Sequence, residues 1–537
     1  MLQNRDCRQG KMNTLWTLGL ASVTAAVVLV AMMVFWRPQT GTATDKLIVY
    51  CAAGVLPPVE RIAAEYEKEY GTAVEIKYGG SNSLLSQLEV DKFSEADLFI
   101  AGDDFYTSLA RDKGLAAETL SVAHMRPVVA VRADGATKIA KFVDLFDEQV
   151  RLSVPNTEQT ALGRAIRAKL SAIESANGNA WLRLEKHVQK HGVFKPTVPD
   201  VATDVIVGNV DAGIVWDATV AMPDVRGKLR SISLPELETD PNLVSVAVLN
   251  SSPQPTAALK FARYLTARDR GLPVFEEFGF RPVEGDVWAE RPSLRFFCGA
   301  VNRRAIDETV NAFAKREGVD IDIKYNGCGI LTSQMKVIDE QKPELGFPDV
   351  YMACDVYYLE NVKQWFQEAS NVSDVEIVIA VPKGSTKVQS LEDLVKPGTR
   401  VAVGEPTQCT IGALTRRLLQ AERLWEKLRE KQQRDGEVVV EKSSSSMLVP
   451  DVITGHVDAA VAYISDTLAS RDKVDVVRIK SQHNRAIQPF SISKSSEHKH
   501  LGRRLFKRIT ASSEAFEKAG FHFRLAETKN GSGDAKQ

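Results

Sequence analysis

Short apolar runs alternate with longer amphipathic stretches along most of this chain. The run LIVYCAAG, residues 47–54, precedes VERIAAEYEKEYG, in which apolar residues recur every three or four positions. A short apolar run bounded by turn residues is typical of a buried strand, and the three-to-four spacing is typical of an amphipathic helix. Repetition of this order predicts βαβ units. We therefore expect an α/β fold with mostly parallel sheets.

The whole pattern occurs twice. Cys51 and Cys298 lie in matching apolar runs 247 positions apart, and Trp216 and Tyr463 keep the same spacing near the ends of the two copies. Between them, VEIKYGGSNSLLSQL in the first copy is matched by IDIKYNGCGILTSQM in the second, which has gained five residues around 342–347. A period of this length predicts two tandem domains and excludes a short solenoid repeat. The expected parts are copy one at 46–282, a linker at 283–292 and copy two at 293–523.

The N-terminal region carries a separate signal. Residues 14–36 form an almost unbroken apolar run of 23 residues, and about 20 are needed to span a bilayer. Arg5, Arg8 and Lys11 precede it, which places that end in the cytoplasm by the positive-inside rule. The alternative is a cleaved signal peptide, whose apolar core is usually ~7–15 residues. We expect a single-pass protein of the cell inner membrane with a cytoplasmic N-terminus (1–13), a transmembrane anchor (14–36), an extracytoplasmic stalk (37–45) and a disordered polar tail (524–537).

Composition narrows the function. The chain has 537 residues, a formal net charge of -1 and 26% charged residues, so nothing in its charge predicts binding to nucleic acid. The sequence holds no Gly-rich nucleotide loop, no nucleophile elbow and no HExxH motif. Paired carboxylates for acid–base catalysis are not evident either. We therefore predict a protein that is not an enzyme and needs no cofactor.

One turn is the best candidate for ligand binding in copy one. Gly79–Ser83 follows a predicted strand and precedes a helical pattern, and ligands of open α/β sheets bind outside the carboxyl ends of the strands. Helix N-termini attract anions through free backbone N–H groups. Ser81 and Asn82 offer hydroxyl and amide donors there. The alternative interpretation is a plain helix cap.

Several segments together carry a family resemblance. LIVYCAAG, YGGSNSLLSQLE, ADLFIAGD, LSVPNTEQTALG and GIVWDA, in this order, resemble the periplasmic molybdate-binding proteins of ABC transporters. The resemblance covers nearly all of copy one and copy two more loosely. It implies the two-lobed type II binding-protein fold, in which a tetrahedral oxyanion is trapped between lobes by hinge closure. It also implies a small oxyanion as ligand, held by neutral donors, and an ABC transporter permease as partner.

The resemblance also assigns ligand-binding positions. In copy one, Ser81 matches the family's second-loop serine, Gly54 stands at the first-loop serine, and Trp216 stands at the tyrosine. Leu162 lies at the loop whose backbone donates. The corresponding positions in copy two are Val301, Cys328, Ile411 and Tyr463.

Copy two has four cysteines, and the resemblance places all of them in loops around the cleft. Three interpretations stay open. The first is a disulfide between two of Cys298, Cys328 and Cys354, and the second is a set of small buried residues. The third is a thiolate metal site that also includes Cys409.

The leading prediction is capture of a molybdate-type or tungstate-type oxyanion for import. The alternatives are a solute sensor or scaffold, and a metal carrier or enzyme that uses the copy-two thiols. Either alternative fits the same fold, because fold alone does not decide function.

Overall fold

The chain is described here from a computed structural model. The predicted N-terminal segments (1–13, 14–36 and 37–45) and nearly all of the predicted tail lie outside the described residues. Within the described part, no helix combines the length and the apolarity needed to cross a membrane. The described residues are 46–90, 95–135, 139–174, 178–341, 343, 346–511 and 513–525.

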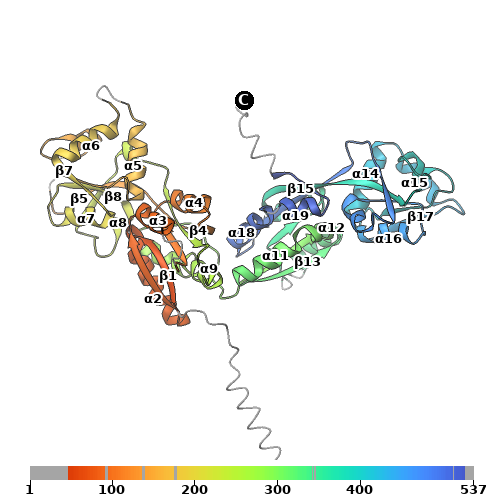
Figure 1. Ribbon diagram of the computed structural model, residues 1–537, viewed down its shortest axis with the longest axis horizontal. Coiled ribbons are helices and arrows are strands. Elements are labelled where there is room, and N and C mark those ends of the chain that lie inside the picture. The colour runs from red at the N-terminus through yellow and green to blue at the C-terminus, as the bar shows by residue number, and fades with distance from the viewer. Residues whose placement is uncertain are drawn as a thin grey trace, which may run out of the picture. The chain divides into compact units, whose positions relative to one another are not determined.

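The first lobe of copy one, which contains β1, β4, α2 and α4 (Figure 1), is built on a six-stranded mixed sheet. The strand order is β11-β4-β10-β3-β1-β2. Its strands are β1 (Lys46–Ala52), β2 (Ala73–Gly79), β3 (Leu98–Ala101), β4 (Ala116–Met125), β10 (Asn242–Leu249) and β11 (Arg281–Pro282). Its helices are η1 (Ala53–Val55), α2 (Leu56–Tyr70), α3 (Ser81–Val90), α4 (Asp104–Asp112), α9 (Pro255–Leu265) and α10 (Gly271–Glu277). Strand β1 runs parallel to β3, whereas β10 is antiparallel to both β3 and β4.

The second lobe of copy one has a five-stranded sheet in the order β7-β6-β8-β5-β9. Its strands are β5 (Pro127–Arg132), β6 (Leu152–Pro155), β7 (Gly192–Lys195), β8 (Ala212–Trp216) and β9 (Leu229–Ile232). Its helices are η2 (Phe142–Phe146), α5 (Ala161–Ser171), α6 (Ala180–His191), α7 (Val198–Ile206), α8 (Asp217–Ala221) and η3 (Pro235–Leu237). Strand β6 is parallel to β7 and β8, and β5 is antiparallel to β8 and β9.

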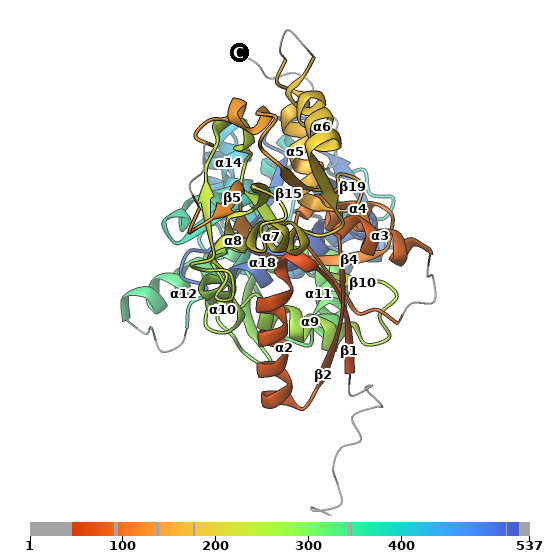
Figure 2. The same ribbon diagram turned by 90° about the vertical axis from the view of Figure 1, so that its left-hand side faces the viewer.

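Helix α2 illustrates how the sequence pattern becomes packing. Val59, Ile62 and Tyr66 recur at three-to-four spacing and are buried, so one face of the helix covers the sheet beside β1 and β2 (Figure 2). The helix ends at Gly71, which has a φ of 70°. Glycine takes this left-handed conformation without steric cost, which is why it terminates helices so often.

Copy two repeats the same order of elements, and its strands form a ten-stranded sheet. Its first lobe contains β12 (Ser293–Gly299), η4 (Ala300–Asn302), α11 (Arg303–Glu317), β13 (Asp320–Asn326), α12 (Cys328–Gln341), β14 (Val350–Met352), α13 (Val356–Glu360), η6 (Lys363–Trp365), β20 (Arg485–Ser493), α18 (Lys499–Thr510), α19 (Ser513–Lys518) and β21 (His522–Phe523). Its second lobe contains η7 (Glu392–Val395), β16 (Val401–Gly404), α14 (Thr410–Ala421), α15 (Trp425–Gln432), β17 (Val439–Lys442), η8 (Ser445–Met447), α16 (Leu448–Ile453), β18 (Ala459–Tyr463), α17 (Ile464–Thr467), η9 (Leu468–Ser470) and β19 (Val474–Arg478). Strand β15 (Phe366–Pro382) belongs to both lobes.

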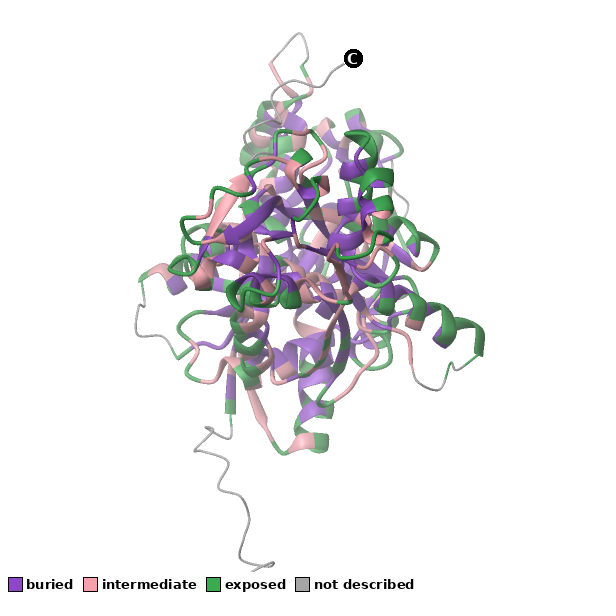
Figure 3. Ribbon diagram, turned by 90° about the vertical axis from the view of Figure 1, so that its right-hand side faces the viewer, coloured by how far each residue is buried: buried purple, intermediate pink, exposed green. Residues whose placement is uncertain are grey.

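The prediction of mostly parallel sheets is wrong, because both lobes of each copy are mixed. Helical crossovers within a lobe produce parallel neighbours such as β6 and β8. Strands that enter from the other lobe need no such crossover, and they pair antiparallel, as β10 does with β3 and β4. Buried residues are concentrated in these strands and on the helix faces that cover them (Figure 3).

The connection between lobes differs between the copies. In copy two, β15 is one strand of 17 residues whose first part pairs with β20 and whose last part pairs with β18 and β19. In copy one the corresponding segment is divided into β4 and β5 at Arg126. The next residue is Pro127, which has no N–H to donate to a ladder. Asp217 holds the backbone between β4 and β5, because its carboxylate accepts a hydrogen bond from the Arg126 N–H at 2.8 Å.

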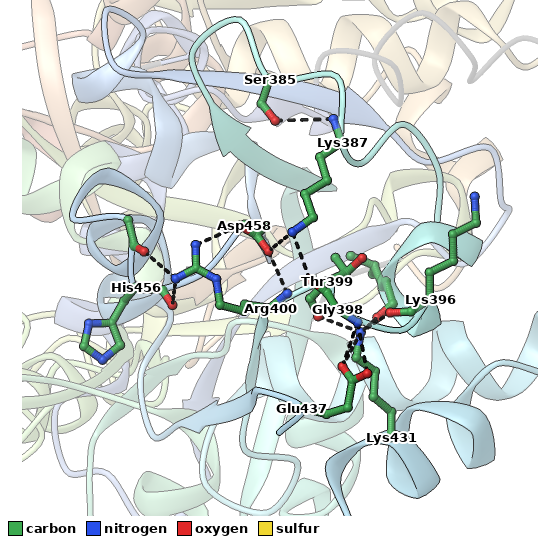
Figure 4. A network of polar contacts seen from close by, with 12 residues as sticks. Ser385, Lys387, Lys396, Gly398, Thr399, Arg400, Lys431, Glu437, His456 and Asp458 are labelled. Atoms are coloured by element: carbon green, nitrogen blue, oxygen red, sulfur yellow. Dashed lines mark hydrogen bonds and ion pairs between the residues drawn. The ribbon is translucent and has the colours of Figure 1, made fainter. Parts of the chain in front are cut away.

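In the second lobe of copy two, a buried lysine binds several backbone carbonyls (Figure 4). Lys431 is 1% exposed, and its ammonium donates to the carbonyls of Leu394, Lys396 and Thr399. Nearby, Asp458 accepts hydrogen bonds from Arg400 and Lys387. Partial burial alone would raise the pKa of Asp458, but these two cations outweigh it and hold the pKa well below the usual range of an aspartate. Asp458 is therefore charged at neutral pH.

Candidate functional site

Copy one has a small cavity between its two lobes. Its volume is about 20 Å³, and it is bounded by the turns that follow β1, β2 and β3 in one lobe and β6, β7 and β8 in the other. No charged side chain of the described residues is among those that line it. The polar or aromatic residues of its wall are Ser81, Thr160, Thr197 and Trp216.

Three helices begin at this cavity. The first residues of α3, α5 and α7 are Ser81, Ala161 and Val198, and all three line it. Thr160 caps α5 and Thr197 caps α7. Each N-terminus carries about half a positive charge through its unpaired backbone N–H groups. Their convergence directs the positive ends of three helix dipoles at the cavity, and the Asp200 carboxylate in the first turn of α7 offsets part of that charge.

Ser81 is held in place to act as a donor. Its side chain is buried, and its Oγ accepts a hydrogen bond from the Gly102 N–H at 3.2 Å. The hydroxyl proton is not used in that bond. Because Ser81 lines the cavity, this proton can be donated to a ligand atom inside it.

Trp216 supplies a second donor from the other lobe. Its ring is 2% exposed, and its indole nitrogen makes no hydrogen bond with another described residue. The ring lies beside Gly54, where an added Cβ would be 3.5 Å from Trp216 Cδ1 and 3.7 Å from Nε1. A Cβ at position 54 would therefore be in ordinary contact with the ring, and only a longer side chain pointing the same way would crowd it.

The lobes of copy one contact each other directly beside the cavity. The Asn82 N–H donates to the Gln159 carbonyl at 3.1 Å, and its side-chain amide donates to the Glu158 carbonyl at 2.8 Å. A Cβ on Gly80 would lie 2.3 Å from the Gln159 oxygen, which is too close for any residue but glycine. Asn82 is thus a contact between lobes and does not line the cavity.

An ion pair missed by the sequence reasoning closes the same edge. Arg164 on α5 lies 2.7 Å from the carboxylate of Asp103, which precedes α4 in the other lobe. Asp103 is buried, caps α4 and also accepts from Asn242. A sequence signal for the capping role existed, since an aspartate directly before a helix favours an N-cap. The partner across the cleft had no local signal.

Copy two has the equivalent cavity, with a volume of about 10 Å³. Val301, Ile411 and Tyr463 line it at the positions that Gly54, Leu162 and Trp216 occupy in copy one. Cys354, Cys409 and Thr410 also line it. Seven of the nine predicted ligand-binding residues therefore lie on the two cavities, and Asn82 and Cys328 do not. Their role in binding remains a prediction.

Copy two has donors of a different kind. The hydroxyl oxygens of Tyr463 and Thr410 are buried and have no hydrogen-bond partner among the described residues. Burial raises the pKa of Tyr463 well above that of a free tyrosine, so its hydroxyl keeps its proton.

The copy-two cysteines separate into different environments. All five described cysteines are free thiols. Cys298 lies in the core on β12, and its counterpart Cys51 is equally buried on β1, so both behave as small apolar residues. Cys328 lies directly behind Cys354. Among the described residues, no three His, Cys, Asp or Glu side chains are arranged to hold a metal ion.

The comparisons with known proteins agree with this architecture. The family model for bacterial extracellular solute-binding proteins matches residues 47–281 and again residues 294–522. The chain belongs to this family. It therefore consists of two tandem periplasmic-binding-protein domains with mixed α/β sheets, and its family is one of binding proteins rather than of enzymes.

Individual relatives match one copy at a time. The solute-binding protein described here is 30% identical over 251 residues to YvgL of Bacillus subtilis, named as an ABC transporter substrate-binding lipoprotein, covering 45% of this chain and 90% of YvgL. It is 23% identical over 237 residues to the molybdate-binding protein ModA of Mycobacterium tuberculosis, covering 43% of this chain and 84% of ModA. The solved periplasmic molybdate-binding protein of Azotobacter vinelandii is 18% identical, covers 44% of this chain and 98% of its own, and has a TM-score of 0.36.

Proposed function

We propose that this protein captures a small tetrahedral oxyanion of the molybdate type outside the cytoplasm and delivers it to an ABC transporter permease. The observation that carries the proposal is the uncharged cavity of copy one, on which three helix N-termini, the Ser81 hydroxyl and the Trp216 indole N–H converge. Relatives named for molybdate binding and for ABC transport support the choice of ligand and partner.

The chemistry of the wall favours an anion over a cation. Backbone N–H groups, a hydroxyl and an indole N–H all donate hydrogen bonds, whereas protein sites for metal cations usually include carboxylate, imidazole or thiolate ligands. None of the residues that line the copy-one cavity carries such a group. Fixed dipoles stabilise a dehydrated dianion without a counter-cation, so release on opening requires no proton or metal.

Closure of the lobes completes the site. Ser81 comes from the first lobe, and Trp216 and Thr160 come from the second, so full coordination exists only when the lobes meet. The Asp103–Arg164 pair and the Asn82 contacts lie across the same edge. A permease that recognises the closed surface would therefore select the loaded protein.

We also propose that residues 14–36 tether the protein to the inner membrane. The support is the length of the apolar run and the basic residues before it. A tether keeps the binding domains close to the permease and raises their effective concentration there. The test is membrane fractionation: the full chain should resist alkaline carbonate extraction, and a chain that lacks 14–36 should be released in soluble form. Release of the full chain by carbonate would contradict the tether.

The function is tested by isothermal titration calorimetry of the purified full-length chain with molybdate, tungstate, sulfate and phosphate. We expect tight binding of molybdate or tungstate at one site per chain. Ser81→Ala should weaken binding about 10- to 100-fold, because a hydrogen bond to a charged ligand contributes about 1.5–3 kcal/mol. The matched control is Ser86→Ala, which makes the same change on the exposed face of α3. Absence of heat and of a thermal shift with all four anions would contradict the proposal.

A further inference from the structure

Copy two contains a pair of contacting thiols at its cavity. Cys328 is the first residue of α12 and Cys354 follows β14, and their Sγ atoms are 2.8 Å apart. The Cys354 N–H donates to Cys328 Sγ at 3.0 Å. Both side chains are buried, with Cys354 on the wall of the cavity and Cys328 behind it.

Copy one has the same backbone arrangement at these positions but no thiols. Ser81 stands where copy two has Cys328, and Gly102 stands where it has Cys354. The Gly102 N–H donates to Ser81 Oγ at 3.2 Å, so the backbone contact is the same in both copies. The Ser81 hydroxyl is a ligand donor, whereas copy two places a thiol there and adds a second thiol in contact with it.

Position 299, which contacts both cysteines, also differs between the two copies. Gly299 in copy two corresponds to Ala52 in copy one. A Cβ on Gly299 would lie 2.2 Å from Cys354 Sγ and 2.9 Å from Cys328 Sγ. Both distances are shorter than any real contact of this kind, so glycine at position 299 is what allows the two sulfurs to lie side by side. Three contacting positions therefore differ in a mutually dependent way.

We propose that Cys328 and Cys354 are a redox-active dithiol that is converted to a disulfide by exchange with an exogenous disulfide. This goes beyond oxyanion capture and needs no bound anion. The family is extracellular, and disulfides form and persist in extracytoplasmic spaces. Within one lobe the bond would join the first turn of α12 to the loop after β14.

The exchange proceeds in two balanced steps. The Cys354 thiolate, on the cavity wall, attacks one sulfur of the incoming disulfide, which releases one thiolate and leaves a mixed disulfide on Cys354. Cys328 then attacks Cys354 Sγ and expels the second thiolate. Overall, two protein thiols are oxidised, one exogenous disulfide is reduced to two thiols, and the two protons pass to the released thiolates.

The environment of Cys328 suits it to the second step. Burial alone would raise the pKa of the Cys328 thiol, but hydrogen bonds outweigh it, led by the one from the Cys354 thiol, so the pKa is lowered. Burial raises the pKa of the Cys354 thiol well above its usual value. Cys328 therefore has the larger thiolate fraction, and it lies at the helix N-terminus, which stabilises a thiolate. Cys354 reacts first because it lies on the cavity wall, although its raised pKa slows that step, and Cys328 is suited to resolve the mixed disulfide.

The test uses the full-length chain treated in its folded state with oxidised glutathione, followed by denaturation, alkylation of free thiols, digestion and mass spectrometry. We expect a peptide linked through Cys328 and Cys354 that disappears after reduction. Cys328→Ser should abolish the link and leave Cys354 glutathionylated, and Cys354→Gly should leave Cys328 alkylated as a free thiol.

The matched control is Cys409→Thr, which replaces another cavity-lining thiol with the copy-one residue and should leave the link intact. Thermal melting of each variant verifies that it folds. Recovery of Cys328 and Cys354 as free thiols after oxidation, or linkage of either one to Cys298 or Cys409, would overturn the proposal. The readout counts thiols, so it is independent of whether copy one binds an oxyanion.

Discussion

Gly54 and Trp216 are expected to act as one unit in ligand binding. Gly54→Ser restores the hydroxyl of the family pattern, but its Oγ extends one bond beyond a Cβ that already lies 3.5 Å from the indole. Overpacking of this kind costs about 1–3 kcal/mol, so Gly54→Ser alone should weaken binding of molybdate about 5- to 100-fold. Gly54→Ala, whose Cβ fits in ordinary contact, should change the affinity little.

The complementary change removes the crowding. Trp216→Tyr alone replaces the indole N–H with a hydroxyl at a different position, and loss of one hydrogen bond to a charged ligand costs about 1.5–3 kcal/mol. In the double variant the smaller ring leaves space for the serine hydroxyl, and both groups can donate to the anion. The binding free energy of the double variant should therefore be at least about 1 kcal/mol more favourable than the two single changes, added together, would predict.

Calorimetric titration with molybdate of the parent chain, both single variants and the double variant measures this coupling. Thermal melting shows whether each variant is folded, so that a packing defect is not mistaken for a lost ligand contact. Affinity changes that add within about 0.5 kcal/mol would refute the reasoning, because independent sites behave in that way.

Three further outcomes follow from contacts in the structure. Arg164→Gln removes the cation from Asp103 across the cleft and should speed dissociation of the anion about 3- to 10-fold in stopped-flow measurements, a modest effect because Arg164 is about a third exposed. Gly80→Ala places a Cβ 2.3 Å from the Gln159 oxygen, so it should prevent full closure and weaken binding while the melting temperature changes less. Asp458 has a lowered pKa in the folded state, so its stabilisation is present above the unfolded pKa of about 3.9 and is lost as the pH falls below it. Denaturant titrations should show that Asp458→Asn lowers stability at pH 7 and that its deficit shrinks towards pH 2.

The Arg164 and Asp458 predictions each have a matched control. Arg167→Gln removes an exposed arginine one turn further along α5, whose partner Glu158 is also exposed, and it should leave the dissociation rate unchanged. Asp472→Asn removes an exposed carboxylate in the same lobe as Asp458 and should leave the acid dependence of stability unchanged. An effect of either control equal to that of its test variant would contradict the structural explanation.

Local patterns predicted much of the fold. The alternation of apolar runs and amphipathic stretches indicated the strands and helices, and the 247-residue register indicated the duplication. The turns after the strands could be assigned to the cleft, since this rule depends only on the order of elements. Ser81 and Leu162 lie there because they follow β2 and β6, and Trp216 lies there because it ends β8.

The remainder depends on contacts that no local pattern records. The strand β10 pairs antiparallel with β3 and β4 although more than 110 residues separate it from either, so the periodicity of β10 alone could not reveal the direction. Asp103 and Arg164 meet only because the lobes meet. Asn82 sits beside Ser81 in the chain, but the helical turn directs it to the opposite lobe and away from the cavity.

The two cavities have equivalent positions, but the residues at several of these positions differ. The pattern of these differences argues against a copy two that has merely lost its binding site. A site that had only lost its ligand would accumulate unrelated replacements. Here Cys354 could not occupy its place if position 299 carried the methyl group of Ala52, since the added Cβ would lie 2.2 Å from its sulfur. The sulfur of Cys354 therefore depends on the glycine at position 299, and together with Cys328 it places two contacting thiols where copy one has a hydroxyl and a glycine. Copy two thus keeps the backbone contact that the Gly102 N–H makes with Ser81 in copy one and adds a second sulfur beside it.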